Sequence, residues 1–193
     1  MITIMSNTAA FDQLQRLAEG ERHLVAGDIL FRTGDSILSL FLVAGGELRL
    51  IRALPHGSQL TLQRAGPGAV LAEASVFADR YQCDASAVED SILRVVPLRR
   101  LRAAFRDDPR LALTFTRHLA HEVHRVRAQA EILSLKKVAE RVDAWSALNG
   151  ATLPPKGHWR QIASEIGVTP EALYRELARR QRILVPGVSA ERK

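Results

Sequence analysis

A short segment near residue 170 carries side chains whose types and spacing suit the reading of DNA bases. If residues 170–179 form a helix, the side chains that face outward are those of Pro170, Glu171, Tyr174, Arg175 and Arg179. In the major groove, arginine pairs well with guanine, and glutamate can accept a hydrogen bond from cytosine. We therefore predict base-edge contacts from Glu171 and Arg175. Phosphate contacts are expected from Arg160, Tyr174 and Arg179.

These side chains need two helices joined by a tight turn to present them. Ile162 and Ile166 recur at helical spacing, and Gly167 supplies the backbone freedom of a sharp turn. Thr169 can cap a second helix whose first residue is Pro170. The pattern predicts a helix-turn-helix, which places the start of its second helix in the DNA major groove, so that Thr169 and Pro170 also belong to the candidate DNA-binding residues. An ordinary helical hairpin fits the same spacing.

The charge distribution favours a nucleic-acid partner. Of the 27 basic and 21 acidic side chains in the chain, residues 1–108 carry 12 and 13, whereas residues 109–193 carry 15 and 8. A neutral half beside a basic half is typical of a protein in which only one part meets phosphate.

Composition limits the remaining classes. The chain has 193 residues with 47% hydrophobic and 25% charged side chains, which indicates a soluble globular protein. No apolar run approaches the roughly 20 residues of a membrane span, and no secretory start is evident, so we expect a cytoplasmic protein without a membrane partner. Cys83 is the only cysteine, which excludes an internal disulfide and an all-cysteine metal cluster from one chain.

The first half of the chain is predicted to be rich in β-structure. Short apolar runs lie near residues 23–25, 29–31, 40–43, 48–51, 60–62 and 92–96, with glycine-containing turns between them. Such even spacing predicts a β-sandwich or barrel. Together with the helices that follow, this gives an α+β fold.

A long helix is predicted after the β-rich part. Asp108 is a natural cap, Pro109 a natural first residue, and neither proline nor glycine interrupts the chain until about residue 133. Apolar residues recur in a heptad pattern that predicts a dimer seam of Leu119, Val123, Val126, Ala130 and Leu133. The alternative is that this stripe packs on the β-rich part of the same chain. A further helix is predicted over residues 138–148.

Several motifs of the β-rich half carry a family resemblance. The runs Gly27–Phe31, Gly34-Asp35, Leu40–Val43 and Gly46–Leu50 resemble the cyclic-nucleotide-binding jelly roll. With the helix-turn-helix downstream, the chain resembles the catabolite-activator and fumarate-nitrate-regulator (Crp/Fnr) family of bacterial transcription factors. The resemblance implies a jelly-roll sensor over residues 1–108, a dimerisation helix and hinge over 109–137 with the hinge at 133–137, and a winged helix-turn-helix over 138–193. Because the chain ends at Lys193, we expect the wing to be truncated or absent.

The resemblance also locates a candidate effector pocket, made of Glu73, Ala74, Ser75, Arg80, Cys83 and Asp84. Glu73 matches the acidic residue that binds the ribose hydroxyl of cyclic nucleotides. Cys83 stands where the family has its phosphate-pairing arginine, and Asp84 replaces the neighbouring hydroxyl residue. Since an anionic phosphate favours a bidentate arginine and is repelled by a carboxylate, we expect an effector other than cyclic AMP, or none. Arg80 is the candidate substitute cation, and no cofactor is predicted.

Other sensing chemistries fit less well. An iron–sulfur sensor needs several cysteines. His118, His121 and His124 repeat every third residue and could hold a metal in part, but we interpret them as a half-exposed helical face, and no metal site is predicted. A cupin-type enzyme needs a histidine-rich site, and the β-rich part offers only His23 and His56.

The sequence therefore predicts a homodimeric, sequence-specific DNA-binding regulator rather than an enzyme. Its expected partners are double-stranded DNA, a second copy of the chain and, as a candidate, RNA polymerase. The alternative is a ligand-binding or protein-interaction module of the same fold that has lost DNA binding, which is motivated by Pro170 and the missing wing. Related activators have an arginine at the position of Pro170, so the recognised site is expected to differ.

Overall fold

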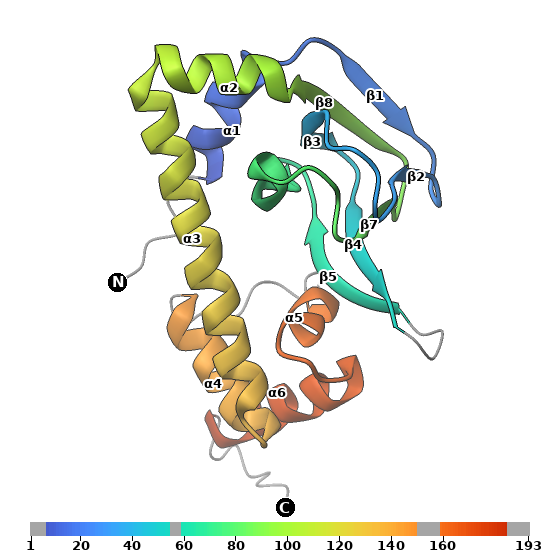
Figure 1. The fold of residues 1–193 in the computed structure, drawn as a ribbon. Helices are drawn as coiled ribbons and strands as arrows, with labels where there is room; N and C mark the ends of the chain where they lie inside the picture. The colour runs from blue at the N-terminus through green and yellow to red at the C-terminus, as the bar shows by residue number, and fades with distance from the viewer. Residues whose placement is uncertain (1–6, 55–58, 150–158, 185–193) are drawn as a thin grey trace, which may run out of the picture. The chain divides into compact units, whose positions relative to one another are not determined.

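A computed structural model describes residues 7–54, 59–149 and 159–184 of the chain (Figure 1). It contains two compact units, one made of residues 5–121 and the other mainly of residues 122–193. The division falls inside the long helix, and each unit is described by itself. His56 and the predicted wing after Gly187 lie outside the described residues.

The first unit is an antiparallel jelly roll, as predicted. Its strands are β1 (Glu21–Leu24), β2 (Ile29–Phe31), β3 (Ser39–Gly45), β4 (Leu48–Ala53), β5 (Gln59–Ala65), β6 (Val70–Leu71), β7 (Asp84–Ala87) and β8 (Ser91–Pro97). They form two four-stranded sheets with the orders β1-β8-β3-β6 and β2-β7-β4-β5. Every strand pairing is antiparallel. A short 3-10 helix, η1 (Glu73–Phe77), follows β6.

Aliphatic side chains from both sheets fill the interior of this unit. Fully buried members are Leu40, Leu42, Leu48, Leu71 and Leu93. Each buried leucine contributes roughly 1.5–3 kcal/mol relative to an exposed one. The β-strand pattern of the sequence therefore corresponds to one continuous apolar core.

Two helices of this unit were not predicted. Helix α1 spans Asn7–Gln15 and α2 spans Leu98–Asp107, whereas the sequence analysis placed the start of helical structure after Asp107. Leu98, Leu101 and Phe105 do recur at helical spacing in α2, but this apolar stripe covers only about two helical turns. Strand β8 also runs directly into α2, because the last residue of the strand, Pro97, is the N-cap residue of the helix.

The remaining helices begin and end close to the predicted residues. They are α3 (Pro109–Ser134), α4 (Val138–Leu148), α5 (Trp159–Glu165) and α6 (Pro170–Leu184). The Asp108 carboxylate accepts a hydrogen bond from the Arg110 N–H at 2.9 Å, as expected of a cap. None of the helices in the described ranges is both long and apolar enough to cross a membrane.

The turn between β3 and β4 provides a test of the jelly roll. Gly46 has a φ of +78°, and a Cβ at this position would overlap the carbonyl oxygen of Asp90 and the Oγ and Cα atoms of Ser91. We expect Gly46→Ala to lower the free energy of unfolding by about 2 kcal/mol or more, because a non-glycine residue in this conformation costs about 1–2 kcal/mol before the overlap is counted. Gly45→Ala is the matched control, since a Cβ there meets nothing within 4 Å. Equal thermal melting curves for the two variants would contradict this account.

Candidate functional site

The turn between α5 and α6 has the geometry of a helix-turn-helix. Gly167 adopts a left-handed φ of +64°, and the Val168 N–H donates to the Ala163 carbonyl at 2.9 Å. The Thr169 hydroxyl oxygen then accepts a hydrogen bond from the Ala172 N–H at 3.2 Å, which caps α6. The sequence therefore specifies both the break after α5 and the first residue of α6.

Helix α6 has one buried and one exposed face. Leu173 and Leu177 lie in a core that includes Ile162 of α5, Ile166 directly after α5, and Val142 of α4. The residues predicted to meet DNA lie outside this core. Those that are exposed are Arg160, Thr169, Glu171, Tyr174, Arg175 and Arg179, and Pro170 is half-buried.

The exposed arginines of this region differ in their partners. Arg179 donates from Nε and Nη2 to the Glu176 carboxylate at 2.9 and 2.8 Å, so its charge is already paired. Within the described ranges, Arg175 and Arg160 have no ion-pair partner. Arg175 therefore has the freer guanidinium on the outward face of α6. The Tyr174 ring lies 5.5 Å from the Trp159 ring of α5, centre to centre.

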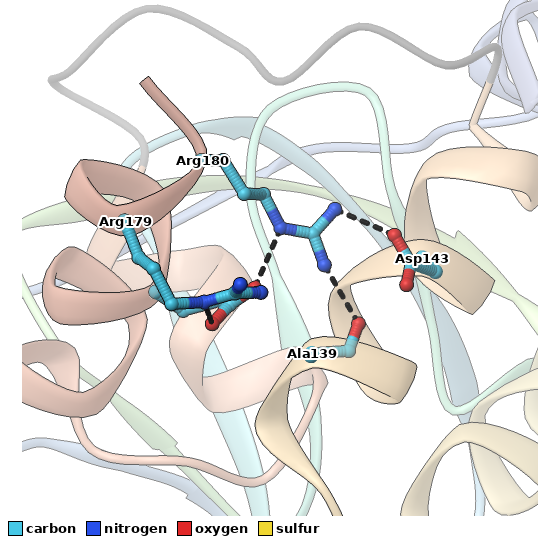
Figure 2. Close-up of polar contacts among 5 residues, drawn as sticks. Ala139, Asp143, Arg179 and Arg180 are labelled. Atoms are coloured by element: carbon cyan, nitrogen blue, oxygen red, sulfur yellow. Dashed lines mark hydrogen bonds and ion pairs between the residues drawn. The ribbon is translucent and has the colours of Figure 1, made fainter. Parts of the chain in front are cut away.

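An ion-pair network that the sequence did not predict connects α6 to α4 (Figure 2). The Glu176 carboxylate also accepts from Arg180 Nε at 2.7 Å. Arg180 in turn donates to the Asp143 carboxylate and to the Ala139 carbonyl of α4. The spacing of Glu176 to Arg179 and Arg180 is a recognisable helical pair signal. The partners on α4 lie about 40 residues away, and no sequence pattern connects them.

The network shifts the acid–base properties of Glu176. The side-chain hydrogen bond from Arg179, supported by Arg180, lowers the pKa of Glu176 from an ordinary value of 4.5 to about 2, although burial opposes this shift. Because this pKa is lowered, the ionised Glu176 carboxylate stabilises the folded state fully above pH 4.5. This stabilisation is lost as the pH falls towards 2.

We expect Glu176→Gln to reduce this acid sensitivity. Wild-type stability, measured by denaturant unfolding monitored through helical circular dichroism, should fall between about pH 4.5 and 2 more steeply than that of the variant. Above pH 5 the variant should be the less stable of the two. Parallel pH profiles would contradict the assigned role of Glu176.

The candidate effector residues lie on η1, in the segment between η1 and β7, and at the first residue of β7. Glu73 is buried, Ala74 is exposed and Ser75 is half-buried. Ala72, directly before η1, has a left-handed φ of +63°. Such a conformation is uncommon for a non-glycine residue and marks a sharply bent entry into η1.

The polar residues of this segment contact the loop between β2 and β3. One Asp84 carboxylate oxygen accepts from the Thr33 N–H at 2.7 Å and from the Thr33 hydroxyl at 2.9 Å. Arg80 Nη1 donates to the Gly34 carbonyl at 2.7 Å, and its side chain is exposed. One donor of the Arg80 guanidinium is therefore engaged with backbone. Cys83 and Asp84 themselves offer no cation to an anionic phosphate.

Cys83 is half-buried and packs against the core of the jelly roll. Burial raises the pKa of the Cys83 thiol, Asp84 raises it further, and Arg52 opposes the shift. The direction agrees with the expectation from Asp84, but burial is the larger cause. A raised pKa disfavours the reactive thiolate near neutral pH.

We therefore predict slow alkylation of Cys83. Iodoacetamide modification, followed by mass spectrometry from pH 7 to 11, should show a midpoint above that of an unstructured cysteine peptide assayed in parallel. A midpoint below that of the peptide would indicate an activated thiol and would overturn this assignment.

The helical histidines do not form one uniform face. His118 is buried beside Phe115, with ring centres 6.1 Å apart, whereas His121 and His124 are exposed. The interpretation of all three as a half-exposed face was therefore wrong for His118. In the described part of the chain, no group of three His, Cys, Asp or Glu side chains is arranged to hold a metal ion.

The predicted dimer seam divides into two parts. Leu119 is half-buried and packs against the jelly-roll core of its own chain. Val123, Val126 and Leu133 are 48%, 55% and 43% exposed, and Ala130 is also exposed. The exposed residues leave an apolar stripe on the second half of α3.

Comparisons with known proteins agree with this architecture. Residues 21–108 match the family model of the cyclic nucleotide-binding domain. The chain is 23% identical over 186 residues to electron transport regulator A of Shewanella oneidensis, covering 91% of this chain and 74% of that protein. It is 31% identical over 117 residues to the cyclic AMP receptor protein of Thermus thermophilus, covering 60% and 54%. The structure of FixK2 from Bradyrhizobium japonicum superposes with a TM-score of 0.65 at 21% identity, covering 90% of this chain and 89% of that one.

A cyclic-nucleotide-binding-type jelly roll followed by a long helix and a helix-turn-helix defines a class of bacterial transcription regulators. Of the two relatives named above, one is by name a regulator of electron transport and the other a cyclic AMP receptor protein. These comparisons support a relationship of this chain to the Crp/Fnr family of transcription regulators.

Proposed function

We propose that this protein is a homodimeric, sequence-specific DNA-binding transcription regulator that acts in the cytoplasm. One observation carries the proposal: α6 buries Leu173 and Leu177 and presents on its outward face the Arg175 guanidinium, which has no ion-pair partner among the described residues. A helix with one buried apolar face and one exposed polar face, capped by Thr169 after a glycine turn, suits insertion into a major groove. The proposed division into sensor, dimerisation helix with hinge, and DNA-binding part follows residues 1–108, 109–137 and 138–193.

The proposed contacts follow from the exposure and pairing of each side chain. Arg175 and Glu171 read base edges, because both are exposed near the N-terminal part of α6. Arg160 and Tyr174 contact phosphates. Arg179 contributes less, because its guanidinium is already paired with Glu176.

Dimerisation is proposed through the exposed apolar stripe of α3, formed by Val123, Val126, Ala130 and Leu133. A second copy would cover side chains that water now contacts, and the heptad spacing suits a helix pair. A two-fold dimer presents two recognition helices to half-sites about 34 Å apart. RNA polymerase is a further proposed partner, as expected of a transcription regulator.

The jelly roll is proposed to sense an effector other than cyclic AMP. Cys83 provides no charge at the position where the family resemblance expects an arginine, and Asp84 would repel an anionic phosphate. An effector would act by shifting the population of dimers whose recognition helices match the half-site spacing.

Selection from a randomised duplex library at near-physiological salt tests the proposal. We expect enrichment of a palindrome with half-sites about one helical turn apart. Salt-sensitive binding without an enriched motif would show that the basic half only holds phosphate. The absence of any binding would contradict the proposal and favour the protein-interaction module.

Two arginine variants separate base reading from phosphate binding. Arg175→Ala should cost about 1–3 kcal/mol on the selected duplex and relax the preference at one base pair per half-site. Arg160→Ala should weaken binding to all sequences alike and reduce the salt slope by about 1 per chain. Fluorescence anisotropy titrations at several salt concentrations measure both. Arg179→Ala is the control, because it is expected to change the affinity for DNA less than either variant. The assignments would be contradicted if Arg160→Ala relaxed the base preference and Arg175→Ala weakened binding to all sequences alike.

A further inference from the structure

Arg141 of α4 makes four hydrogen bonds to backbone carbonyls from three separate segments. Its Nε donates to the Leu135 carbonyl at 2.8 Å, and its Nη2 donates to the Leu133 carbonyl at 3.1 Å. Its Nη1 donates to the carbonyls of Ile166 and Gly167 at 2.9 and 2.8 Å. One side chain therefore joins the end of α3, the linker before α4 and the turn of the helix-turn-helix.

The position of this guanidinium has a physical reason. The last carbonyls of a helix lack partners within the helix and carry partial negative charge. Leu133 lies in the final turn of α3, and Ile166 follows the last residue of α5. Arg141 is half-buried and satisfies carbonyls at both helix ends at once. Only a planar group with five donors can do this from a single point.

The region that Arg141 connects, made of Leu133, Leu135, Ile166 and Gly167 and called the joint below, is closely packed. A Cβ on Gly167 would overlap Leu133 Cδ2 and lie 3.2 Å from Arg141 Nη1. Glycine at this position therefore serves both the left-handed turn and the approach of α3. Nearby, Ile132 is buried in the core shared by α4, α5 and α6, and the Gln129 side chain donates to the Glu165 carbonyl at 3.4 Å.

The joint thus connects two proposed functional elements. Leu133 packs against Gly167 on one side and is 43% exposed, within the apolar stripe proposed to form the dimer. Any change in the angle between the last turn of α3 and the helix-turn-helix must alter the Arg141 contacts, since they span both. In a dimer, that angle sets the distance between the two recognition helices.

We propose that Arg141 is a positioning residue for DNA recognition, which fixes the helix-turn-helix to the end of α3 and thereby sets the half-site spacing that the dimer accepts. It acts through the backbone carbonyls of Leu133, Leu135, Ile166 and Gly167 rather than by touching DNA. The proposal rests on the proposed function of a dimeric DNA-binding regulator.

The test compares Arg141→Lys with the wild type on two kinds of duplex. Lysine keeps the charge, but a single ammonium cannot reach carbonyls of three segments together. The first set of duplexes carries two selected half-sites with spacers lengthened or shortened by single base pairs, and the second carries one half-site. Arg125→Lys is the matched control, because Arg125 is exposed and paired only with Glu122 of its own helix among the described residues.

We expect the wild type and Arg125→Lys to prefer one spacer by on the order of tenfold or more. Arg141→Lys should lose most of this preference and bind the neighbouring spacers within about threefold of the best one. Its affinity for the single half-site, normalised to the folded fraction from circular dichroism, should remain within about threefold of the wild type, because the α6 face is intact.

Two results would overturn the proposal. Retention of the wild-type spacer preference by Arg141→Lys would show that the joint does not set the spacing. A parallel loss of single half-site binding and of folded helix would show that Arg141 only stabilises the fold. If the wild type itself shows no gain from a second half-site, the dimeric function fails instead, which distinguishes the two hypotheses.

Discussion

The candidate DNA-binding surface depends on the burial of a single apolar stripe of α6. Leu173 and Leu177 pack against Ile162, Ile166 and Val142, and this packing decides which polar side chains face outward. Each buried aliphatic side chain contributes roughly 1.5–3 kcal/mol, whereas an exposed ion pair contributes about 0–1 kcal/mol. The Asp143 side chain is 66% exposed, so its ion pair with Arg180 contributes less to the position of α6 than the apolar core does. The core sets the orientation, and the polar network refines it.

The jelly roll keeps the scaffold of the cyclic nucleotide-binding domain, and two of its polar residues bind a loop of the protein itself. Asp84 and Arg80 both bind the loop around Thr33 and Gly34. Tyr81, between them in sequence, stacks on Phe31 with ring centres 3.6 Å apart and donates its hydroxyl to the Ser39 carbonyl at 3.0 Å. Burial raises the pKa of Tyr81 to about 12, so the hydroxyl stays protonated and remains a donor. The segment is thus anchored to protein groups at the positions where the family resemblance expects ligand contacts.

The sequence predicted those features that depend on local signals. The starts of α3 and α6 follow from an Asp or Thr cap before a proline, and Gly167 marks the turn, because capping and left-handed turns are decided by a few adjacent residues. Strand β7 offers only small side chains, so it was not predicted. Helix α2 was missed because its apolar stripe is short and directly follows the apolar strand β8. The contacts of Arg141 and Arg180 span 25 and 37 residues, and such distant pairs leave no periodic pattern.

The same limit applies to the predicted dimer seam. A heptad pattern reports which residues share a face of a helix but not what covers that face. Leu119 packs within its own chain, and only the residues from Val123 onward are exposed. The part of the predicted seam that is exposed to solvent therefore lies in the second half of α3.

Methylation interference on the selected duplex tests the central claim most directly, because it probes guanine N7 in the major groove. The account predicts interference at guanines in two symmetric half-sites about one helical turn apart, with the signal at one guanine per half-site lost in Arg175→Ala. Interference confined to one half-site, or a complex insensitive to N7 methylation, would contradict recognition by a pair of α6 helices in the major groove.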